Sequence, residues 1–274
     1  MRDIARFLKE DLGSEGDITT KSIIGKQKVT AHIIAKENCV VAGIDEARKI
    51  LWQFKIDSKK FTDDGSKIRK GDVVLELEGD AKKILSIERL ILNFMMRMSG
   101  IATLTAEVVD KSRKINPEID IAATRKTTPG FRYYEKKAVI LGGGSPHRLG
   151  LYDSILIKDN HLKVVGSIEE AVSKSKKNAH GKIVEVETDN MQEAIRALKA
   201  GADVIMLDNF KPADVEKTVK KLKSLKKDVL IEVSGGITPE NIEQYAKWAD
   251  IISLGALTHS YKSKDFSLEV TKVI

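Results

Sequence analysis

Residues 182–208 read KIVEVETDNMQEAIRALKAGADVIMLD, in which two strand-like runs enclose one helical pattern. Ile183–Glu187 (IVEVE) and Val204–Asp208 (VIMLD) are short, mostly apolar runs, as expected of buried parallel strands. Between them, Met191–Ala200 has apolar residues at helical spacing and is followed by Gly201, a typical helix end. A strand, a helix and a second strand in this order predict a βαβ unit and a parallel sheet.

The same alternation continues in both directions from this unit. The further predicted strands are Ile119–Ala123, Ser154–Ile157, Val229–Val233 and Ile251–Leu254. The predicted helices between them are Ser167–Lys176, Pro212–Leu225 and one opened by Thr238-Pro239-Glu240. Six apolar strands alternating with helices favour an α/β fold of the (β/α) barrel type.

The first 100 residues follow a different pattern. Strands are predicted at Val29–Ala35, Val40–Ala42 and Val73–Leu77, and helices at Ile44–Phe54 and from Ser86 to about Lys114. Because this α+β pattern has no βα repeat, we expect a separate N-terminal domain over residues 1–101. The barrel-type domain is expected over 102–259, with the segment 260–274 packing back on the first domain.

Composition excludes several classes of protein. The chain has 274 residues, 42% hydrophobic, and no run near the roughly 20 apolar residues that span a bilayer. The charged N-terminal stretch lacks the apolar core of a signal peptide, so a cytoplasmic protein without a membrane partner is expected. Cys39 is the only cysteine, which excludes an intrachain disulfide, and we expect it to be a small packing residue rather than a nucleophile.

The net charge of +7 admits nucleic acid as a partner. However, much of the excess lies in lysine runs on predicted amphipathic helices, where charges usually face solvent. Aromatic content is only 5%, and no aromatic residues alternate with basic ones as they do on surfaces that stack bases. A nucleic-acid-binding protein is therefore a minor alternative, and no nucleic-acid partner is expected.

The residues that follow the six strands carry charge, glycine or small polar groups. They are Arg125-Lys126, Lys158-Asp159, Glu187, Asp208-Asn209, Ser234-Gly235-Gly236 and Gly255-Ala256. In barrel enzymes the active site is built at the C-terminal ends of the strands. Loops are polar in general, but that does not readily explain acids after two strands, cations after two others and glycine turns after the last two. We therefore expect an active site at these ends.

The stretch from Thr124 to His161 is strongly cationic and is interrupted by glycines. Its Gly142–Gly144 run precedes Ser145-Pro146-His147-Arg148 and fits neither the P-loop nor the dinucleotide-binding pattern. The glycines either let backbone amides approach a ligand or make a plain tight turn. The excess of cations predicts a small anionic substrate.

Glu187 and Asp208 end neighbouring strands, which places both carboxylates on one rim. Two carboxylates there suit Mg²⁺, which proteins often hold through one or two carboxylates and the phosphates of a substrate. Binding of sugar hydroxyls and general acid–base catalysis are the alternatives, the last being the less favoured with so many cations nearby. The glycine turns after the last two strands lie where barrels commonly bind phosphate.

At these residues the chain resembles the quinolinate phosphoribosyltransferase family. The resemblance covers nearly the whole chain and rests on Glu88-Arg89 with Asn93, SGIAT at 99–103, TRKTTPG at 124–130, GGGSPHRLGLYDSILIKDNH at 142–161, EVE at 185–187, MLDN at 206–209, SGGI at 234–237 and GALTHS at 255–260. It implies an N-terminal α/β open sandwich followed by an incomplete (β/α) barrel of about six parallel strands. It also implies conversion of quinolinate and phosphoribosyl pyrophosphate to nicotinate mononucleotide, CO₂ and pyrophosphate in NAD synthesis.

By resemblance, four residues would hold the two quinolinate carboxylates: Arg125, His147, Arg148 and Lys158. Lys126 would lie between the two substrates. The active site would lie at the interface of a homodimer, with Arg89 donated by the partner subunit, and dimers could assemble further into a hexamer.

For phosphoribosyl pyrophosphate, Glu187 and Asp208 would bind the ribose hydroxyls and Mg²⁺, the expected cofactor. Ser234, Gly235 and Gly236, with Gly255 and Ala256, would take the 5-phosphate. Catalysis would be carried by four residues: Lys126, Lys158, Glu187 and Asp208.

One residue departs from the family pattern. Many members have Asn before the His-Arg pair, whereas this chain has Pro146, which fixes φ and removes an amide donor. This departure supports an alternative, a fold relative associated with molybdenum transport that uses another anionic substrate. The intact LIKDNH and TRKTTPG segments favour the quinolinate enzyme.

Overall fold

The structure, a computed structural model, describes residues 2–274, and the chain divides into two compact units. The first unit holds the residues up to Ala106 together with Ile140–Gly142 and Tyr261–Ile274, and we call it the antiparallel unit. The second holds Glu107–Val139 and Gly143–Ser260, and we call it the parallel unit. The division falls within one long helix, α4 (Ala81–Arg113).

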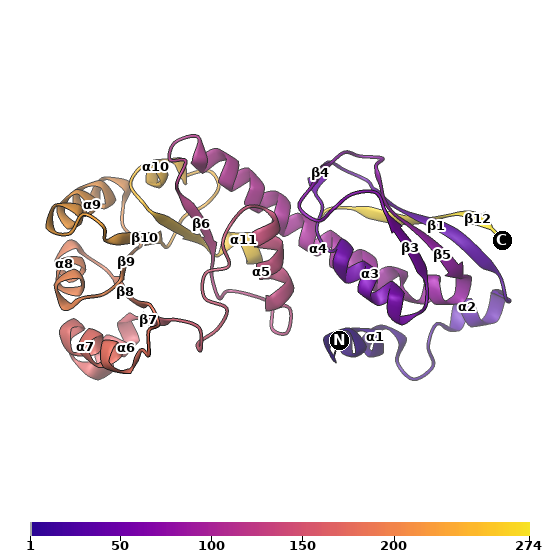
Figure 1. The fold of residues 1–274 in the computed structure, drawn as a ribbon, viewed down its shortest axis with the longest axis horizontal. Coiled ribbons are helices and arrows are strands. Elements are labelled where there is room, and N and C mark those ends of the chain that lie inside the picture. The colour runs from indigo at the N-terminus through magenta and orange to yellow at the C-terminus, as the bar shows by residue number, and fades with distance from the viewer. Residues whose placement is uncertain (1) are drawn as a thin grey trace. The chain divides into compact units, whose positions relative to one another are not determined.

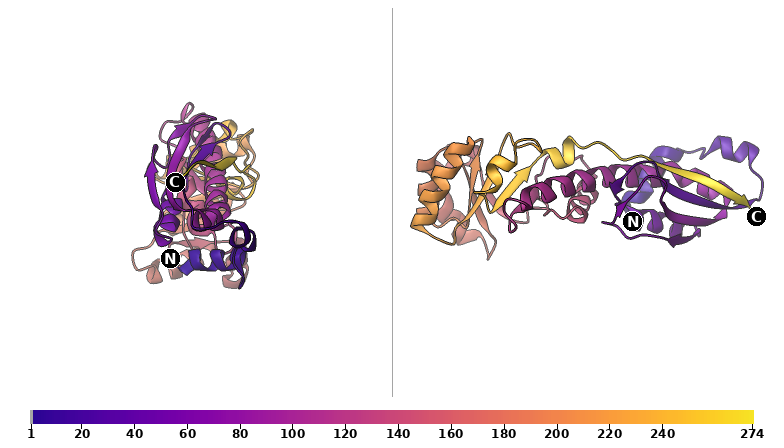
Figure 2. Two further views of the ribbon diagram at one scale, coloured as in Figure 1. Left: turned by 90° about the vertical axis from the view of Figure 1, so that its right-hand side faces the viewer. Right: turned by 90° about the horizontal axis from the view of Figure 1, so that it is seen from above.

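The antiparallel unit is built on a four-stranded sheet in the order β12-β1-β5-β3. Its strands are β1 (Lys28–Ala35), β3 (Asp57–Lys60), β5 (Val73–Asp80) and β12 (Phe266–Val273). A short pair, β2 (Cys39–Val40) and β4 (Lys67–Ile68), and the helices α1 (Arg2–Leu12), α2 (Ile18–Ile23) and α3 (Ile44–Gln53) complete it with the first part of α4. The C-terminal strand β12, yellow in Figure 2, pairs along the whole of β1 except its first residue.

Alternating burial explains why β1 forms one face of a sheet. Val29, Ala31, Ile33 and Ala35 are buried, whereas the residues between them are partly exposed. Because side chains alternate across a strand, these four apolar residues share one face and cover the core.

The parallel unit contains a six-stranded parallel sheet in the order β6-β11-β10-β9-β8-β7. Its strands are β6 (Asp120–Ala123), β7 (Ile155–Ile157), β8 (Val184–Thr188), β9 (Val204–Asp208), β10 (Leu230–Ser234) and β11 (Ile251–Leu254). The connecting helices are α5 (Arg132–Leu141), α6 (Asp159–Val165), α7 (Ile168–Asn178), α8 (Met191–Ala200), α9 (Pro212–Leu225), α10 (Glu243–Ala246) and α11 (Ala256–His259). Figure 1 shows α7, α8 and α9 side by side along β7–β10.

The predicted fold class is confirmed, an antiparallel-sheet unit followed by six parallel strands with helices. The predicted bounds of α8, α9, β9 and β11 match the structure, and most of the other predicted elements differ by a few residues at their ends. The sequence analysis did not predict α1, α2, β3, β4, α5, α6, α11 and β12. Cys39 is buried, and burial raises the pKa of its thiol to about 11, as suits a packing residue. Within the described residues, no helix has the length and apolarity needed to cross a membrane.

The helix predicted to open at Thr238-Pro239-Glu240 is wrong, because α10 begins at Glu243 and is four residues long. Residues 238–242 form a hydrogen-bonded turn, in which the Asn241 and Ile242 N–H groups both donate to the Thr238 carbonyl, at 3.2 and 3.1 Å. The amide oxygen of the Asn241 side chain accepts from the Thr238 N–H, and its amide nitrogen donates to the Gly236 carbonyl, at 2.8 and 3.0 Å. Such bonds between a side chain and nearby backbone groups fix the turn that leads into α10.

Candidate active site

The C-terminal ends of the six parallel strands meet at one edge of the sheet, as the sequence predicts. At this edge Asp208 of β9 lies in register with Ser234 of β10. The site there is built from a contact between the segments after β6 and β11, a turn after β10, an ion pair between the residue after β7 and an acid on β8, and the segment 145–148.

The segments that follow β6 and β11 lie against each other. Thr258 Oγ1 donates a hydrogen bond to the Lys126 carbonyl at 2.7 Å. A Cβ atom added to Gly255 would lie 2.7 Å from His259 Nε2 and 3.0 Å from Lys126 Cδ. Glycine at 255 therefore lets the Lys126 side chain cross the turn that the sequence assigned to phosphate.

The turn after β10 is held against the end of β9 by Asn209. This residue has a left-handed backbone, with φ 58°, and its N–H donates to the Ser234 carbonyl at 2.9 Å. A Cβ atom on Gly235 would lie 2.3 Å from Asn209 Oδ1, so a side chain cannot be placed there without a shift. The Asn209 amide also donates to Asp208 Oδ2 at 2.5 Å. The contact fixes the turn and the carboxylate together.

Two carboxylates and a lysine gather at the ends of β7, β8 and β9. Lys158, which follows β7, forms an ion pair with Glu187 of β8, whose side chain is 12% exposed. Burial and the charge of Glu187 raise the pKa of Asp208 above its ordinary value. The two acids are thus close enough to repel each other, a repulsion that a divalent cation would relieve. The donor set fits Mg²⁺.

The segment 145–148 enters the site alongside β6. Ser145 forms a parallel bridge with Ala122, and its N–H donates to the Ile121 carbonyl at 2.8 Å. Gly143 has φ 87°, and the Gly144 N–H donates to the Val139 carbonyl at 3.1 Å. The glycine run thus forms a turn that leads out of α5 and places the following residues beside the sheet.

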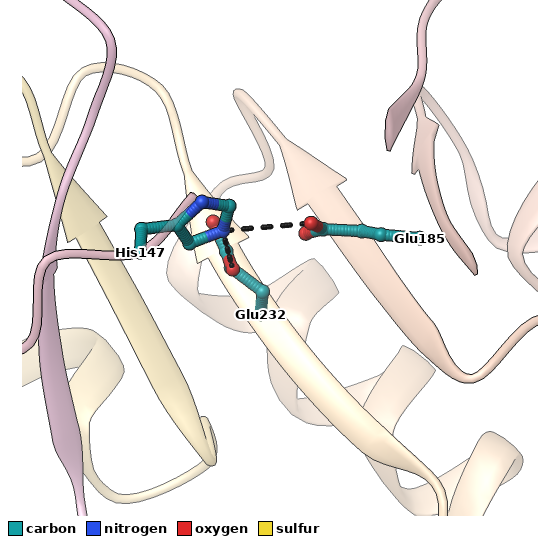
Figure 3. Close-up of side chains that lie close together, drawn as sticks. All are labelled: His147, Glu185 and Glu232. Atoms are coloured by element: carbon teal, nitrogen blue, oxygen red, sulfur yellow. Dashed lines mark hydrogen bonds and ion pairs between the residues drawn. The ribbon is translucent and has the colours of Figure 1, made fainter. Parts of the chain in front are cut away.

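His147 lies between two buried glutamates, Glu185 of β8 and Glu232 of β10 (Figure 3). Its Nε2 is 3.0 Å from Glu232 Oε2 and 3.4 Å from Glu185 Oε2. Burial alone would lower the pKa of His147, but the hydrogen bonds to Glu185 and Glu232 outweigh it and raise this pKa to about 10. Burial, opposed in part by His147, raises the pKa of Glu185 to about 7.

Arg125 and Arg148 add two guanidinium groups to this part of the site. Arg148 is 9% exposed, and burial followed by the charge of Arg125 lowers its pKa. Arg125 Nε is buried and has no hydrogen-bond partner in the described chain. A buried and a half-buried cation close to each other, one of them with an unpaired buried donor, make a site that is prepared for an anion.

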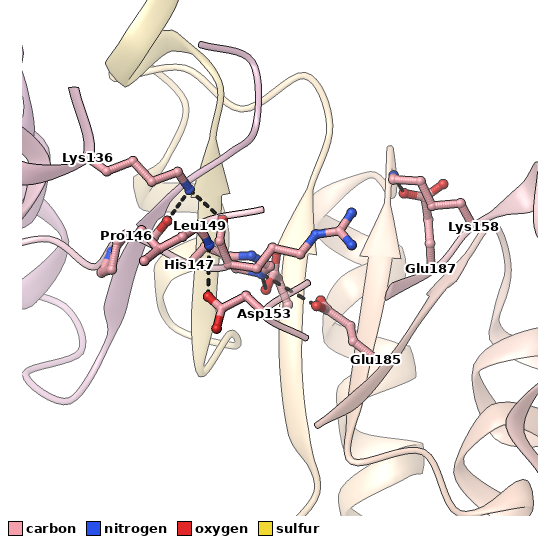
Figure 4. A network of polar contacts seen from close by, with 10 residues as sticks. Lys136, Pro146, His147, Leu149, Asp153, Lys158, Glu185 and Glu187 are labelled. Atoms are coloured by element: carbon pink, nitrogen blue, oxygen red, sulfur yellow. Dashed lines mark hydrogen bonds and ion pairs between the residues drawn. The ribbon is translucent and has the colours of Figure 1, made fainter. Parts of the chain in front are cut away.

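Three residues that sequence reasoning missed support this site: Lys136, Glu185 and Glu232. Lys136 lies within the cationic stretch from Thr124 to His161, where nothing in the sequence separates it from a structural or surface charge, yet it is only 1% exposed. Its Nζ donates to the carbonyls of Pro146 and Arg148 (Figure 4). The sequence did hold a signal for the two acids, because each lies inside a buried, otherwise apolar strand and such an acid needs a partner.

The remaining predicted site residue, Arg89, lies on α4 in the antiparallel unit, where it is exposed. Among the described residues, the one group of three or more side chains close enough to share a metal ion is His147, Glu185 and Glu232. Glu187 and Asp208 do not belong to such a group, so Mg²⁺ at these two would need further ligands from substrate or water.

Buried cations, paired carboxylates and glycine turns at the C-terminal edge of a parallel sheet define the class of protein, a barrel-type enzyme for anionic substrates. Residues 17–99 match the N-terminal domain of quinolinate phosphoribosyl transferase, and residues 101–269 match its C-terminal domain. The chain belongs to the quinolinate phosphoribosyl transferase family.

Similar proteins cover nearly the full chain. The probable nicotinate-nucleotide pyrophosphorylase (carboxylating) of Methanothermobacter thermautotrophicus is 45% identical over 276 residues, which cover 98% of this chain and 99% of that protein. The human nicotinate-nucleotide pyrophosphorylase (carboxylating) is 39% identical over 242 residues, 88% of this chain and 82% of that protein. The crystal structure of nicotinate-nucleotide pyrophosphorylase from Ehrlichia chaffeensis has a TM-score of 0.93 at 36% identity and covers 98% of both chains.

Proposed function

We propose that the cationic part of this site binds quinolinate and that its carboxylate part binds phosphoribosyl pyrophosphate. The reaction is the one that this family carries out in NAD synthesis, the decarboxylating transfer of a phosphoribosyl group. The observation that carries the assignment is the pair of guanidiniums at Arg125 and Arg148: Arg148 is buried, and Arg125 is half-buried with its buried Nε unpaired. Quinolinate is a dianion, and its planar carboxylates suit the fork of donors on arginine.

In this proposal the quinolinate carboxylates bind to Arg125, His147, Arg148 and Lys158. Two cations for each carboxylate would neutralise the charge that the substrate brings into a partly buried site. Lys126, which crosses the turn at Gly255, would stand between the two substrates and limit repulsion between the carboxylates of one and the phosphates of the other.

Glu187 and Asp208 would hold the ribose hydroxyls of phosphoribosyl pyrophosphate and the Mg²⁺ that accompanies it. When bound, Mg²⁺ supplies positive charge to the pyrophosphate leaving group. The turns at Ser234–Gly236 and Gly255-Ala256 would take the 5-phosphate on backbone N–H groups, as barrel enzymes do after their last strands.

The chemistry then needs no nucleophile from the protein. The pyridine nitrogen of quinolinate attacks C1 of the ribose, and the bond from C1 to pyrophosphate breaks. The cationic ring that results accepts the electron pair of the bond to the C2 carboxylate, which leaves as CO₂, and a proton takes its place on C2. Lys126, Lys158, Glu187 and Asp208 contribute positioning and preorganised charge.

Purified protein with quinolinate, phosphoribosyl pyrophosphate and Mg²⁺ should release nicotinate mononucleotide and CO₂ in equal amounts. The site assignment is tested separately by Arg148→Ala, which should raise the KM for quinolinate by about 100-fold, since a charged hydrogen-bond pair is lost. The KM for phosphoribosyl pyrophosphate should change little. Turnover of nicotinate but not of quinolinate would contradict the assignment of the substrate.

We also propose a homodimer in which Arg89 of the partner subunit completes each site. Its support is the exposure of Arg89 on α4 and the family to which the chain belongs. Arg89→Ala and Arg148→Ala should each be nearly inactive alone. Mixing the two and allowing subunits to exchange should restore part of the activity, because one of the two sites in a mixed dimer is intact. No restoration after demonstrated exchange would argue against the shared site.

A further inference from the structure

We infer that Lys136, Glu185 and Glu232 are positioning residues that clamp the segment Pro146–Arg148 from two sides. This segment, which we call the cation loop, would thereby present His147 and Arg148 together to one carboxylate of the substrate. The inference rests on the proposed quinolinate site and adds the groups that hold that site in shape.

On one side, Lys136 of α5 bridges both ends of the cation loop. Its Nζ donates to the Pro146 carbonyl and, at 2.8 Å, to the Arg148 carbonyl, so one ammonium group ties together the residues on either side of His147 (Figure 4). His147 itself has φ 49°, a left-handed conformation that costs a residue with a side chain about 1 kcal/mol or more. Surrounding contacts must hold such a residue, and the bridge from Lys136 supplies two of them.

On the other side, the two glutamates hold the imidazole. Glu185 and Glu232 lie on strands separated by β9, and both direct Oε2 at the same ring nitrogen, Nε2 of His147 (Figure 3). Both side chains are almost fully buried, and the second oxygen of each, Oε1, has no hydrogen-bond partner within the described chain. A pair of buried carboxylates with unpaired oxygens costs stability that apolar side chains would not. In this inference the two glutamates are present, despite that cost in stability, because they orient His147.

The arrangement leaves one ring donor for the substrate. A doubly protonated imidazole has two N–H donors, and the glutamates accept from Nε2. Nδ1–H then remains for a substrate carboxylate, next to the guanidinium of the following residue, Arg148. Without the glutamates the ring would be free to rotate and to lose a proton, and the loop would present one cation in place of two.

The same three side chains could instead share a metal ion, because their ligand atoms all lie within 4.8 Å of one another. The distances from Nε2 to the carboxylate oxygens, 3.0 and 3.4 Å, are those of hydrogen bonds, and this favours the ion-pair arrangement. Metal analysis of the purified protein decides between the two. A stoichiometric divalent metal that Glu232→Gln removes would overturn the positioning role.

The kinetic experiment compares Glu232→Gln, Glu185→Gln and Lys136→Met with matched exposed controls, Glu169→Gln and Lys220→Met. Glu169 pairs with Arg196, and Lys220 pairs with Glu216, both at the surface. Each buried variant should raise the KM for quinolinate about tenfold or more and leave the KM for phosphoribosyl pyrophosphate within about twofold, since only the cation loop loses its support. Lys136→Arg, which keeps the charge and the donors, should recover part of the loss.

A spectroscopic measurement of the His147 ring gives a second test that does not depend on enzyme kinetics. In protein with ¹⁵N-labelled histidine at neutral pH, the His147 ring should be doubly protonated in the wild type and in Glu169→Gln. It should be neutral in the Glu185→Gln/Glu232→Gln double variant. Unchanged ring signals together with unchanged quinolinate KM would overturn the inference, as would an equal rise in KM for both substrates.

Arg148→Ala separates this inference from the proposed function. If that variant leaves the quinolinate KM unchanged, the proposed quinolinate site is wrong. If Arg148→Ala raises it but none of the three buried variants does, the site stands and the positioning role fails.

Discussion

His147 Nε2 and Glu232 Oε2 are 3.0 Å apart, although 85 residues separate them in the sequence. The contact joins a loop that leaves α5 to the middle of β10. It explains why an acid occupies the interior of a buried strand, and it makes His147 a stable cation. The protonation of His147 and of Glu185, the second acid at the same ring nitrogen, links the pH dependence of folding to the site.

The free energy of unfolding should fall as pH rises from about 5 to about 8; above that, the pKa of Lys136, which burial lowers to about 8, acts in the opposite direction. Two groups drive this: the pKa of Glu185 is raised from 4.5 to about 7 and that of His147 from 6.5 to about 10. Both shifts mean that the folded state binds protons more tightly, so stability is greatest below the ordinary pKa and is lost through the folded pKa. The Tm of the Glu185→Gln/Glu232→Gln variant should decline less over this range than that of Glu169→Gln, and an equal decline would contradict the assignment.

Asp208→Asn should weaken catalysis through the phosphoribosyl half of the site. The variant removes a carboxylate proposed to bind Mg²⁺ and ribose, so we expect kcat to fall about 100-fold or more. The Mg²⁺ concentration for half-maximal rate should also rise. Asp189→Asn serves as the control, because Asp189 is exposed nearby. Binding of quinolinate alone, measured by calorimetry, should be unchanged in both variants.

Gly235→Ala should impair binding of phosphoribosyl pyrophosphate and cost about 1–3 kcal/mol of stability. The new Cβ would lie 2.3 Å from Asn209 Oδ1, at a position with φ +84°. Gly201→Ala is the control for backbone strain without a steric contact. Gly201 has φ +94°, and a Cβ atom added there would meet nothing within 4 Å. The control should lose stability but keep its KM for both substrates.

Cys39 should react slowly with thiol reagents in the native protein. Burial raises its pKa to about 11, and it is the only cysteine in the chain. Alkylation by iodoacetamide near pH 8 should become fast only in denaturant, and Cys39→Ala should retain activity. Rapid labelling of the native protein, or loss of activity in this variant, would show that Cys39 is more than a packing residue.

Local sequence determined most of the secondary structure of this protein. The run Val204–Asp208 is apolar for four residues and acidic at the fifth, and it forms β9 with those bounds. Asn190 and Gly201 stand on either side of α8, where the Asn190 side chain accepts from the Glu193 N–H and Gly201 adopts a left-handed C-cap. These are short-range effects of periodicity and capping, so a sequence pattern is enough to predict them.

The residue types at the strand ends also came from the sequence. Because all strands of the sheet are parallel, the residues after Ile157, Asp208 and Ser234 had to share one edge. The residue types alone did not show which cations are buried, which acids face them and which charges support the site. Only the tertiary structure decided these points. Lys136 reads as a surface charge on α5, but its ammonium is covered and holds the cation loop.

Pro146 is a second residue whose role could not be predicted from the sequence. The sequence marked it as a lost amide donor, whereas the fold uses its carbonyl as an acceptor for Lys136. Glu185 and Glu232 were visible as acids within apolar strands, and their common partner His147 comes from a loop remote from both in sequence. Sequence alone therefore determined the parallel sheet, the residue types at the C-terminal ends of its strands and the family. Only the tertiary structure decided the partners of buried charges, because burial and pairing depend on contacts between segments that are distant along the chain.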